Sequence, residues 1–212
     1  MVFEIVEKED KFVDGVIRKS IDELNDFFEI NWTGNLPRIF FMPDRKTCDY
    51  IAQKKTEDWG VGWVYSDYRD AFTAIFILSR ENYEKESCHE YSDERYAALI
   101  KHELCHAFIR VFMKCRGYMP VWLNEGLCTY LSGQNKFRKR PEKFSKFLDY
   151  YDSHGPDVYH EPGFVVKFLV EKFGRKKFME FLEGAREICS REEFDELFKR
   201  VFEREIGYDM FG

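Results

Sequence analysis

The sequence lacks any apolar run approaching the roughly 20 residues that cross a bilayer, so we expect no membrane-spanning segment. Its first ten residues are acidic and carry no apolar signal-peptide core, which argues against a secretory signal. Glycine and proline number only 13 and 6, which excludes collagen-like and low-complexity chains. With 44 % apolar residues, the 212-residue chain can bury a sizeable core. These features predict one compact globular domain over residues 1–212, and we expect a monomer.

The chain also lacks an excess of positive charge. Its formal net charge is −6, whereas a nucleic-acid-binding protein needs a basic face, so we expect no nucleic-acid partner. The most basic stretch runs over residues 136–140 and continues through Lys143 and Lys146. Such a stretch is either an ordinary solvated face or an interaction patch.

Paired cysteine motifs are absent. The six cysteines are scattered and form no Cys-x-x-Cys pair, which favours reduced thiols and a cytoplasmic location. The six are Cys48, Cys88, Cys105, Cys115, Cys128 and Cys189.

The first half of the chain mixes helix and strand patterns. Apolar residues at three-and-four spacing predict a helix over residues 14–30, and a second helix is expected over 45–55. A short apolar run predicts a strand over 38–42. Two runs rich in β-branched and aromatic residues, 60–65 and 71–78, predict two strands of a hairpin.

The second half has helical patterns throughout. We expect helices at 92–115, 120–131, 141–151, 158–173, 175–184 and 191–204. Strands followed by helices indicate an α+β fold, with an α/β upper half over about residues 1–115 and a helical lower half over about 116–212.

One segment carries chemistry. His102 and His106 are four residues apart, so on a helix both imidazoles lie on one face and can bind one metal ion, with Glu103 beside them. A third ligand is available in Glu125, after an eighteen-residue gap. The first helix, a short loop and the opening turn of the next helix are long enough to bring Glu125 back to the histidines.

The pattern His-Glu-x-x-His, an eighteen-residue gap and a glutamate within Trp-Leu-Asn-Glu-Gly resembles the gluzincin clan of zinc peptidases. The resemblance is to the catalytic core of the aminopeptidase N family and its short stand-alone relatives, over about residues 70–180. It implies a zincin-like, thermolysin-like domain with a small mixed β-sheet and an active-site helix in the upper half. It also implies one Zn²⁺ ion held by His102, His106 and Glu125.

The same resemblance implies the catalytic roles. Glu103 would act as general base and then acid, taking a proton from the attacking water and passing it to the leaving amine. Tyr159 is the candidate for stabilising the oxyanion, with His160 and His154 as alternatives, although Tyr159 could also only pack at a helix start. In such peptidases an edge strand aligns an extended substrate, which would place Thr73, Ala74 and Ile75 at the middle of that strand.

The sequence departs from the family at two points. It lacks the Gly-x-Met-Glu-Asn segment that holds a substrate amino terminus, so aminopeptidase activity does not carry over. Ser132 stands where the family often has a carboxylate, so Thr129 or Asn124 would have to support the histidines instead. Cys105 lies inside the motif, and we expect it to face the core.

The sequence therefore predicts a zinc peptidase that acts on peptides or unfolded protein. Two alternatives stay open: an inert peptide-binding or regulatory module on the same fold, and a zinc hydrolase of a non-peptide amide or ester.

Overall fold

The computed structural model describes residues 9–66, 73–114 and 117–211. Its first half contains helix α1 (Lys11–Phe28), strand β1 (Arg38–Met42), helix α2 (Arg45–Ala52) and strands β2 (Gly62–Ser66) and β3 (Thr73–Leu78). The predicted strand over 38–42 is confirmed at both ends. The predicted turn between the last two strands, together with residues 71 and 72, lies outside the described residues.

The three strands form a small mixed sheet in the order β1-β3-β2. Strand β3 pairs in parallel with β1 and antiparallel with β2, so the predicted antiparallel pairing of the two later strands is confirmed. Four of the six residues of β3 are fully buried: Ala74, Ile75, Ile77 and Leu78. Burial on both faces is typical of a central strand, which is covered on each side of the sheet.

The second half is helical, with α3 (Asp93–Phe112), α4 (Val121–Leu131), α5 (Pro162–Phe173), α6 (Arg175–Ala185) and α7 (Arg191–Phe202). Helices were predicted in all five places, with ends that differ by a few residues. No helix among the described residues is both long enough and apolar enough to cross a membrane.

Short 3-10 helices connect these elements: η1 (Gln134–Phe137), η2 (Phe147–Asp149), η3 (Pro156–Tyr159) and η4 (Tyr208–Phe211). The predicted helix over 141–151 is wrong, since that segment contains only turns and η2. Its backbone N–H groups at residues 145–147 donate to the buried carboxylate of Glu161 instead of to helical carbonyls.

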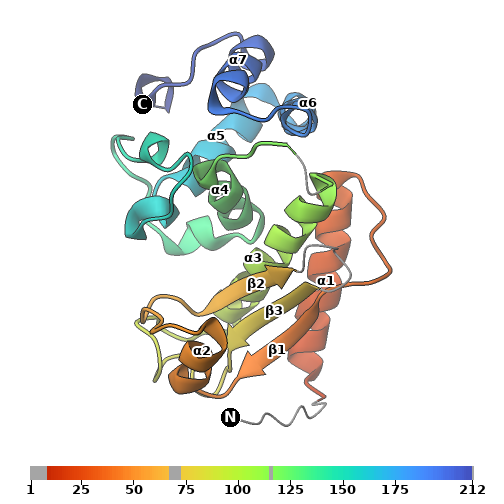
Figure 1. Ribbon diagram of the computed structural model, residues 1–212, viewed down its shortest axis with the longest axis vertical. Helices are drawn as coiled ribbons and strands as arrows, with labels where there is room; N and C mark the ends of the chain where they lie inside the picture. Colours follow the sequence, from red (N-terminus) through yellow and green to blue (C-terminus); the bar gives the residue numbers. More distant parts are fainter. Residues whose placement is uncertain (1–8, 67–72, 115–116, 212) are drawn as a thin grey trace.

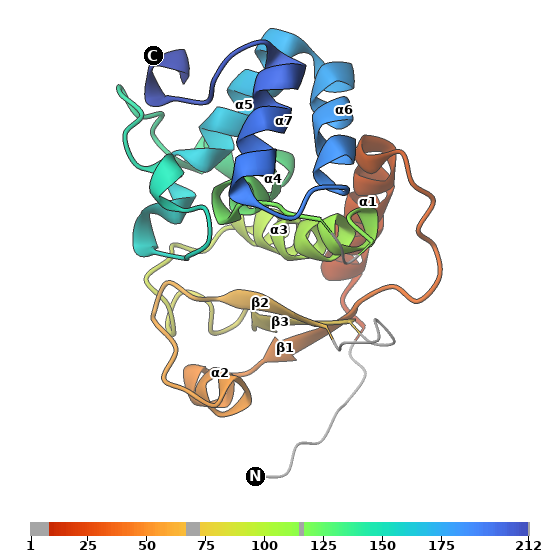
Figure 2. The ribbon, with the colours of Figure 1, turned by 45° about the horizontal axis from the view of Figure 1, so that its top comes forward.

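Helix α3 runs through the middle of the molecule. Its N-cap is Ser92, whose hydroxyl accepts a hydrogen bond from the Arg95 backbone N–H. Figure 2 shows α3 above the sheet, with α1 beside it and with α4 to α7 on the side away from the strands. Twelve of its residues are buried, because both the sheet and the helices pack against it. Figure 1 shows the same division between strands and later helices, so the molecule is an α+β protein.

Candidate metal centre

Helix α3 presents two imidazoles on one face. His102 and His106 are one turn apart, and their Nε2 atoms lie 3.1 Å from each other. The side chain of His102 is 6 % exposed and that of His106 is 20 % exposed. The helix therefore places two potential ligand atoms at a single point at the edge of the core.

Helix α4 brings a carboxylate to the same point. Oε2 of Glu125 lies 3.3 Å from Nε2 of His102 and 3.5 Å from Nε2 of His106, and the side chain is 6 % exposed. Helix α4 begins directly after Pro120, which lets Glu125 reach α3 from its second turn. The three predicted ligands thus converge, although 18 residues separate His106 from Glu125 in the sequence.

The spacing of these three atoms fits a zinc-sized ion. Ligands of tetrahedral Zn²⁺ with bonds of 2.0–2.1 Å lie about 3.3–3.4 Å apart, which is close to the three separations in this site. Within the described residues, the buried Oε2 atom of Glu125 makes no hydrogen bond of normal geometry. A donor set of two imidazole nitrogens and one carboxylate oxygen is one that Zn²⁺ accepts, so the residues fit this ion.

The charge states of Glu125 and His106 depend on each other. Burial alone would raise the pKa of Glu125, but the two imidazoles outweigh it and hold that pKa well below its usual range. For His106, burial lowers the pKa and the Glu125 carboxylate raises it, with a net rise to about 10. Glu125 is therefore an ionised carboxylate facing nitrogen atoms, as a metal ligand must be.

Asn124 orients one of the two imidazole rings. Its Oδ1 lies 2.7 Å from Nδ1 of His106, at a distance where the ring N–H donates to the amide oxygen. This bond fixes the ring and leaves Nε2 as the atom that faces the other candidate ligands, where a metal ion would displace its proton. Of the two supports considered from the sequence, Asn124 makes this contact, whereas the buried Thr129 hydroxyl has no hydrogen-bond partner in the described part of the chain.

Glu103 lies next to the three potential ligands and is 5 % exposed. Burial raises its pKa, the nearby histidines oppose that rise, and Glu125 adds to it. The carboxylate packs against strand β2, since a Cβ atom added at Gly62 would lie 2.8 Å from its Oε1 atom. A larger residue at this position would force the Glu103 side chain to shift.

Tyr159 lies on the other side of the site, in η3. Its ring centre is 6.4 Å from that of His102 and 5.9 Å from that of Trp59. Burial and the two site carboxylates raise its pKa well above the usual range, so the phenol keeps its proton. A protonated phenol beside the histidines is a hydrogen-bond donor, as an oxyanion stabiliser must be.

The two alternative histidines differ in position. Nδ1 of His154 lies 3.7 Å from Oε1 of Glu125, although its side chain is 65 % exposed. His160 is equally exposed, and its ion-pair partner is Asp157, 3.9 Å away. The structure thus brings Tyr159 and His154 to the site, while the contacts of His160 point elsewhere.

The expectation that residues 73–75 belong to an edge strand is wrong. Strand β3 pairs with β1 on one side and β2 on the other, and Ala74 and Ile75 are in register with both neighbours, whereas Thr73 at the start of the strand is in register with β2 alone. The backbone of a central strand is occupied on both sides and cannot align a substrate by main-chain hydrogen bonds. The edge strand next to α3 is β2, which the sequence did not distinguish because a strand pattern does not report its neighbours.

Cys105 is fully buried and faces the core, as predicted. Its neighbour across the helix pair is Cys128 of α4, whose Sγ lies 3.4 Å from Nδ1 of His106. The site is therefore backed by two thiols that solvent does not reach.

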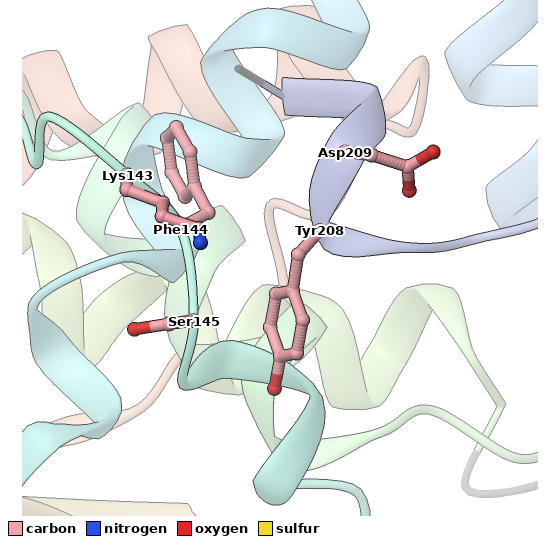
Figure 3. A pocket seen from close by; sticks show the side chains of 5 residues that line it. All are labelled: Lys143, Phe144, Ser145, Tyr208 and Asp209. Carbon is pink, nitrogen blue, oxygen red and sulfur yellow. The ribbon is translucent and has the colours of Figure 1, made fainter.

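Two surface hollows are not lined by any of the three candidate metal ligands. One, of about 480 Å³, lies between residues 143–145 and η4, where Tyr208 faces the loop and the Asp209 carboxylate points away from it (Figure 3). The other, of about 290 Å³, is lined by Trp32, Thr73 and Arg110 among others. Neither contains a predicted site residue other than Thr73.

Sequence reasoning missed the contributions of Gly62, Trp59 and Arg138. The glycine packs against Glu103, Trp59 contacts Tyr159, and the Arg138 guanidinium carbon lies 5.9 Å from the centre of the Tyr159 ring. No local pattern marks them, because each reaches the site through a contact between distant segments.

No known protein family, curated protein or solved structure matches this chain.

Proposed function

We propose that this chain is a zinc-dependent peptidase with a zincin-like fold of the gluzincin type. The observation that carries the proposal is the convergence of His102, His106 and Glu125 at metal-ligand spacing, with Glu103 buried beside them. The α+β architecture, with a mixed sheet on one side of α3 and helices on the other, is compatible with it.

The side chains of His102, His106 and Glu125 would hold the ion. When bound, Zn²⁺ lowers the pKa of water and polarises a carbonyl group. Asn124 keeps the His106 ring in the orientation that exposes Nε2. Ion pairing with the imidazoles keeps Glu125 ionised, so it remains a ligand over the physiological pH range.

Glu103 performs the proton transfers in this proposal. Its carboxylate accepts a proton from the attacking water and delivers it to the nitrogen of the leaving amine. The raised pKa that burial gives Glu103 suits both steps, because a carboxylate with a very low pKa would be a poor base. Gly62 keeps this carboxylate in place by allowing strand β2 to approach closely.

Tyr159 donates a hydrogen bond to the developing oxyanion. Its phenol is protonated, and its ring lies against His102 and Trp59. His154 is the second candidate for this role because its ring lies 3.7 Å from the Glu125 carboxylate. The substitution Tyr159→Phe keeps the ring and removes only the hydroxyl. Comparing kcat for Tyr159→Phe and His154→Ala therefore shows which of the two side chains stabilises the oxyanion, because only the loss of that side chain should lower kcat strongly.

An extended peptide would align on strand β2. The Leu78 N–H donates to the Val61 carbonyl, so by antiparallel alternation the main-chain groups of Gly62 and Val64 point away from β3. Gly62 also contacts Glu103, which places this free edge next to the proposed base. Peptide or unfolded-protein substrates, which present extended backbone, fit such an edge.

The decisive experiment compares Glu103→Gln with the wild-type protein. We expect the variant to retain stoichiometric zinc and to lose peptide hydrolysis by about 10²-fold or more, because the proton acceptor is gone. Zinc is measured by elemental analysis, and cleavage is measured on a broad library of quenched fluorescent peptides. Glu196→Gln, at an exposed glutamate on α7, is the matched control and should behave as wild type.

Three outcomes would contradict the proposal. They are full activity in Glu103→Gln, wild-type protein without stoichiometric zinc after metal loading, and zinc-loaded protein that cleaves no peptide. Cleavage only of a non-peptide amide or ester would support the hydrolase alternative, whereas peptide binding without turnover would support an inert binding module.

A further inference from the structure

Arg138 is a half-buried cation near the candidate metal centre, and no residue that the structure describes provides it with an anionic partner. Its guanidinium carbon lies 5.9 Å from the centre of the Tyr159 ring. With the described residues it makes no side-chain hydrogen bond or ion pair. Burial is the main influence on its charge; Tyr159 comes next and favours the charged form, and the cation Arg95 follows and repels it. Burial and this repulsion lower the pKa of Arg138.

The neighbouring basic side chains each have an acidic partner or are exposed to water. Lys136 pairs with Glu94, Lys139 with Glu142, and Arg95 with Glu90 at 3.8 Å. Arg140 is exposed, so water can solvate its charge. Among the described residues, Arg138 alone of the five is both half-buried and unpaired, and partly removing a charge from water without a partner costs free energy. The basic stretch seen in the sequence thus contains one member whose environment differs from that of a solvated face.

The backbone that carries Arg138 is anchored. Its N–H donates to the Asn135 carbonyl, which closes η1, and Nδ2 of Asn135 donates to the Gly163 carbonyl at 2.8 Å. The turn is therefore attached to the first turn of α5, directly after the segment that carries Tyr159. Because the turn is already fixed, binding a ligand would have to order only the side chain of Arg138 and not its backbone.

Arg138 is within reach of a peptide bound at the metal centre. Both contact the Tyr159 ring, whose centre is 6.4 Å from the centre of the His102 ring and 5.9 Å from the guanidinium carbon. The guanidinium carbon is thus at most about 12 Å from the His102 ring centre, a distance that three or four extended residues span.

We propose that Arg138 binds a carboxylate of the peptide substrate, so the site selects peptides with a free carboxylate within a few residues of the cleaved bond. This inference rests on the proposed peptidase function. The planar guanidinium matches a carboxylate with two parallel hydrogen bonds, and such a ligand would supply the anion that the described part of the chain does not. The carboxylate could belong to the carboxyl terminus of the peptide or to an Asp or Glu side chain.

Paired peptides separate these two sources. Each short quenched peptide is made with a free or an amidated carboxyl terminus, and with Glu or Gln at each position in turn. We expect kcat/KM for one carboxylate-bearing series to exceed that of its neutral partner by at least about tenfold, because a hydrogen-bonded ion pair contributes that much when partly desolvated. A preference between free and amidated termini identifies the terminal carboxylate, and one between Glu and Gln identifies the side chain.

Variants at position 138 test the residue itself. In Arg138→Gln the ratio of carboxylate to neutral kcat/KM should fall toward 1, and in Arg138→Lys it should be intermediate, because the charge stays while the two-pronged geometry is lost. Arg140→Gln, the same change at the exposed neighbour, should keep the wild-type ratio. Thermal unfolding of each variant verifies that it is folded. Equal kcat/KM for all paired peptides in wild type, or an unchanged preference in Arg138→Gln, would overturn the inference while leaving the peptidase function standing.

Binding measurements on an inactive variant test the Arg138 inference independently of peptide cleavage. Zinc-loaded Glu103→Gln should bind the preferred carboxylate peptide at least about tenfold more tightly than its neutral partner by calorimetry, and adding Arg138→Gln should remove that difference. If wild-type protein cleaves no peptide but this binding pattern appears, the proposed function fails and Arg138 remains a carboxylate site. If Glu103→Gln binds both peptides of each pair equally, the Arg138 inference is wrong.

Discussion

Two buried glutamates lie side by side at the centre of this molecule, and their surroundings give them opposite properties. Glu125 faces both imidazoles, and their attraction for its charged form outweighs the effect of burial. Burial dominates at Glu103, and the neighbouring Glu125 charge adds to it. A carboxylate with a lowered pKa suits a ligand, and one with a raised pKa suits a proton carrier. The different roles proposed for the two glutamates follow from this difference.

The contact between Asn124 and His106 leads to a prediction on metal affinity. Asn124→Ala removes the acceptor for Nδ1–H of His106, so the ring loses its fixed orientation. We expect zinc affinity to fall by about 10- to 100-fold. Competition with a chromophoric chelator measures it.

Asn31→Ala, at an exposed loop amide, is the control and should bind zinc as the wild type does. An unchanged affinity in Asn124→Ala would show that another group orients His106.

At the scale of elements, α3 is held in place by its neighbours on both sides. Helix α1 packs along it through contacts such as Phe28 with Phe108, whose ring centres are 6.3 Å apart. Strand β2 approaches it at Gly62. The segment before β2 is in turn fastened by Arg45, whose guanidinium donates to the backbone carbonyls of residues 57, 58, 60 and 86. The site is therefore built on elements whose own positions are fixed.

The ion pair between α1 and α3 leads to a prediction on pH dependence. A hydrogen bond from Lys101 lowers the pKa of Glu23, whose side chain is 44 % exposed. A lowered folded-state pKa contributes stability above the unfolded pKa of 4.5, and this contribution is lost as the pH falls through the folded-state value. Glu23→Gln should thus lower the free energy of unfolding at pH 7 by at most about 1 kcal/mol, and the difference should vanish in acid.

Urea unfolding at a series of pH values measures this difference. Asp22→Asn changes an adjacent exposed carboxylate on α1 and should show no comparable pH dependence. A Glu23→Gln effect that persists below the folded-state pKa would mean that the substitution acts through packing and not through charge.

At the scale of the whole molecule, the candidate metal centre joins the two halves. Two potential ligands come from α3, which packs on the sheet, and the third comes from α4, the first element of the helical half. An ion bound at this point would cross-link the halves. The proposed substrate strand β2 and the Arg138 turn lie in different halves, so a bound peptide would contact both.

Metal binding should therefore stabilise the whole fold. At a free zinc concentration about 100 times the dissociation constant, linkage gives about 2.7 kcal/mol. For a chain of this size we expect Tm to rise by about 5–10 °C. Differential scanning calorimetry with and without a chelator measures the shift.

His106→Ala removes one ligand and should abolish most of this shift. An equal increase in Tm in wild type and His106→Ala would show that zinc acts at another place on the protein.

Much of the local structure could be predicted from the sequence because short-range rules govern it. The capping serine and unbroken helical pattern located α3, the apolar run located β1, and the fixed four-residue spacing of His102 and His106 placed both rings on one face. The length of the intervening segment also allowed Glu125 to return to them. In each case the information lies within one or two consecutive elements.

Contacts between distant segments decided the rest. Residues 141–151 have a helical pattern, but the Glu161 carboxylate binds the backbone N–H groups at residues 145–147 and favours a turn. β3 has the pattern of any strand, and only its pairing with both β1 and β2 makes it central. Arg138 differs from its basic neighbours because folding partly buries it while no described residue provides an anion. Periodicity and capping depend on adjacent residues, whereas strand order, side-chain-to-backbone anchoring and burial of charge depend on which remote surfaces meet.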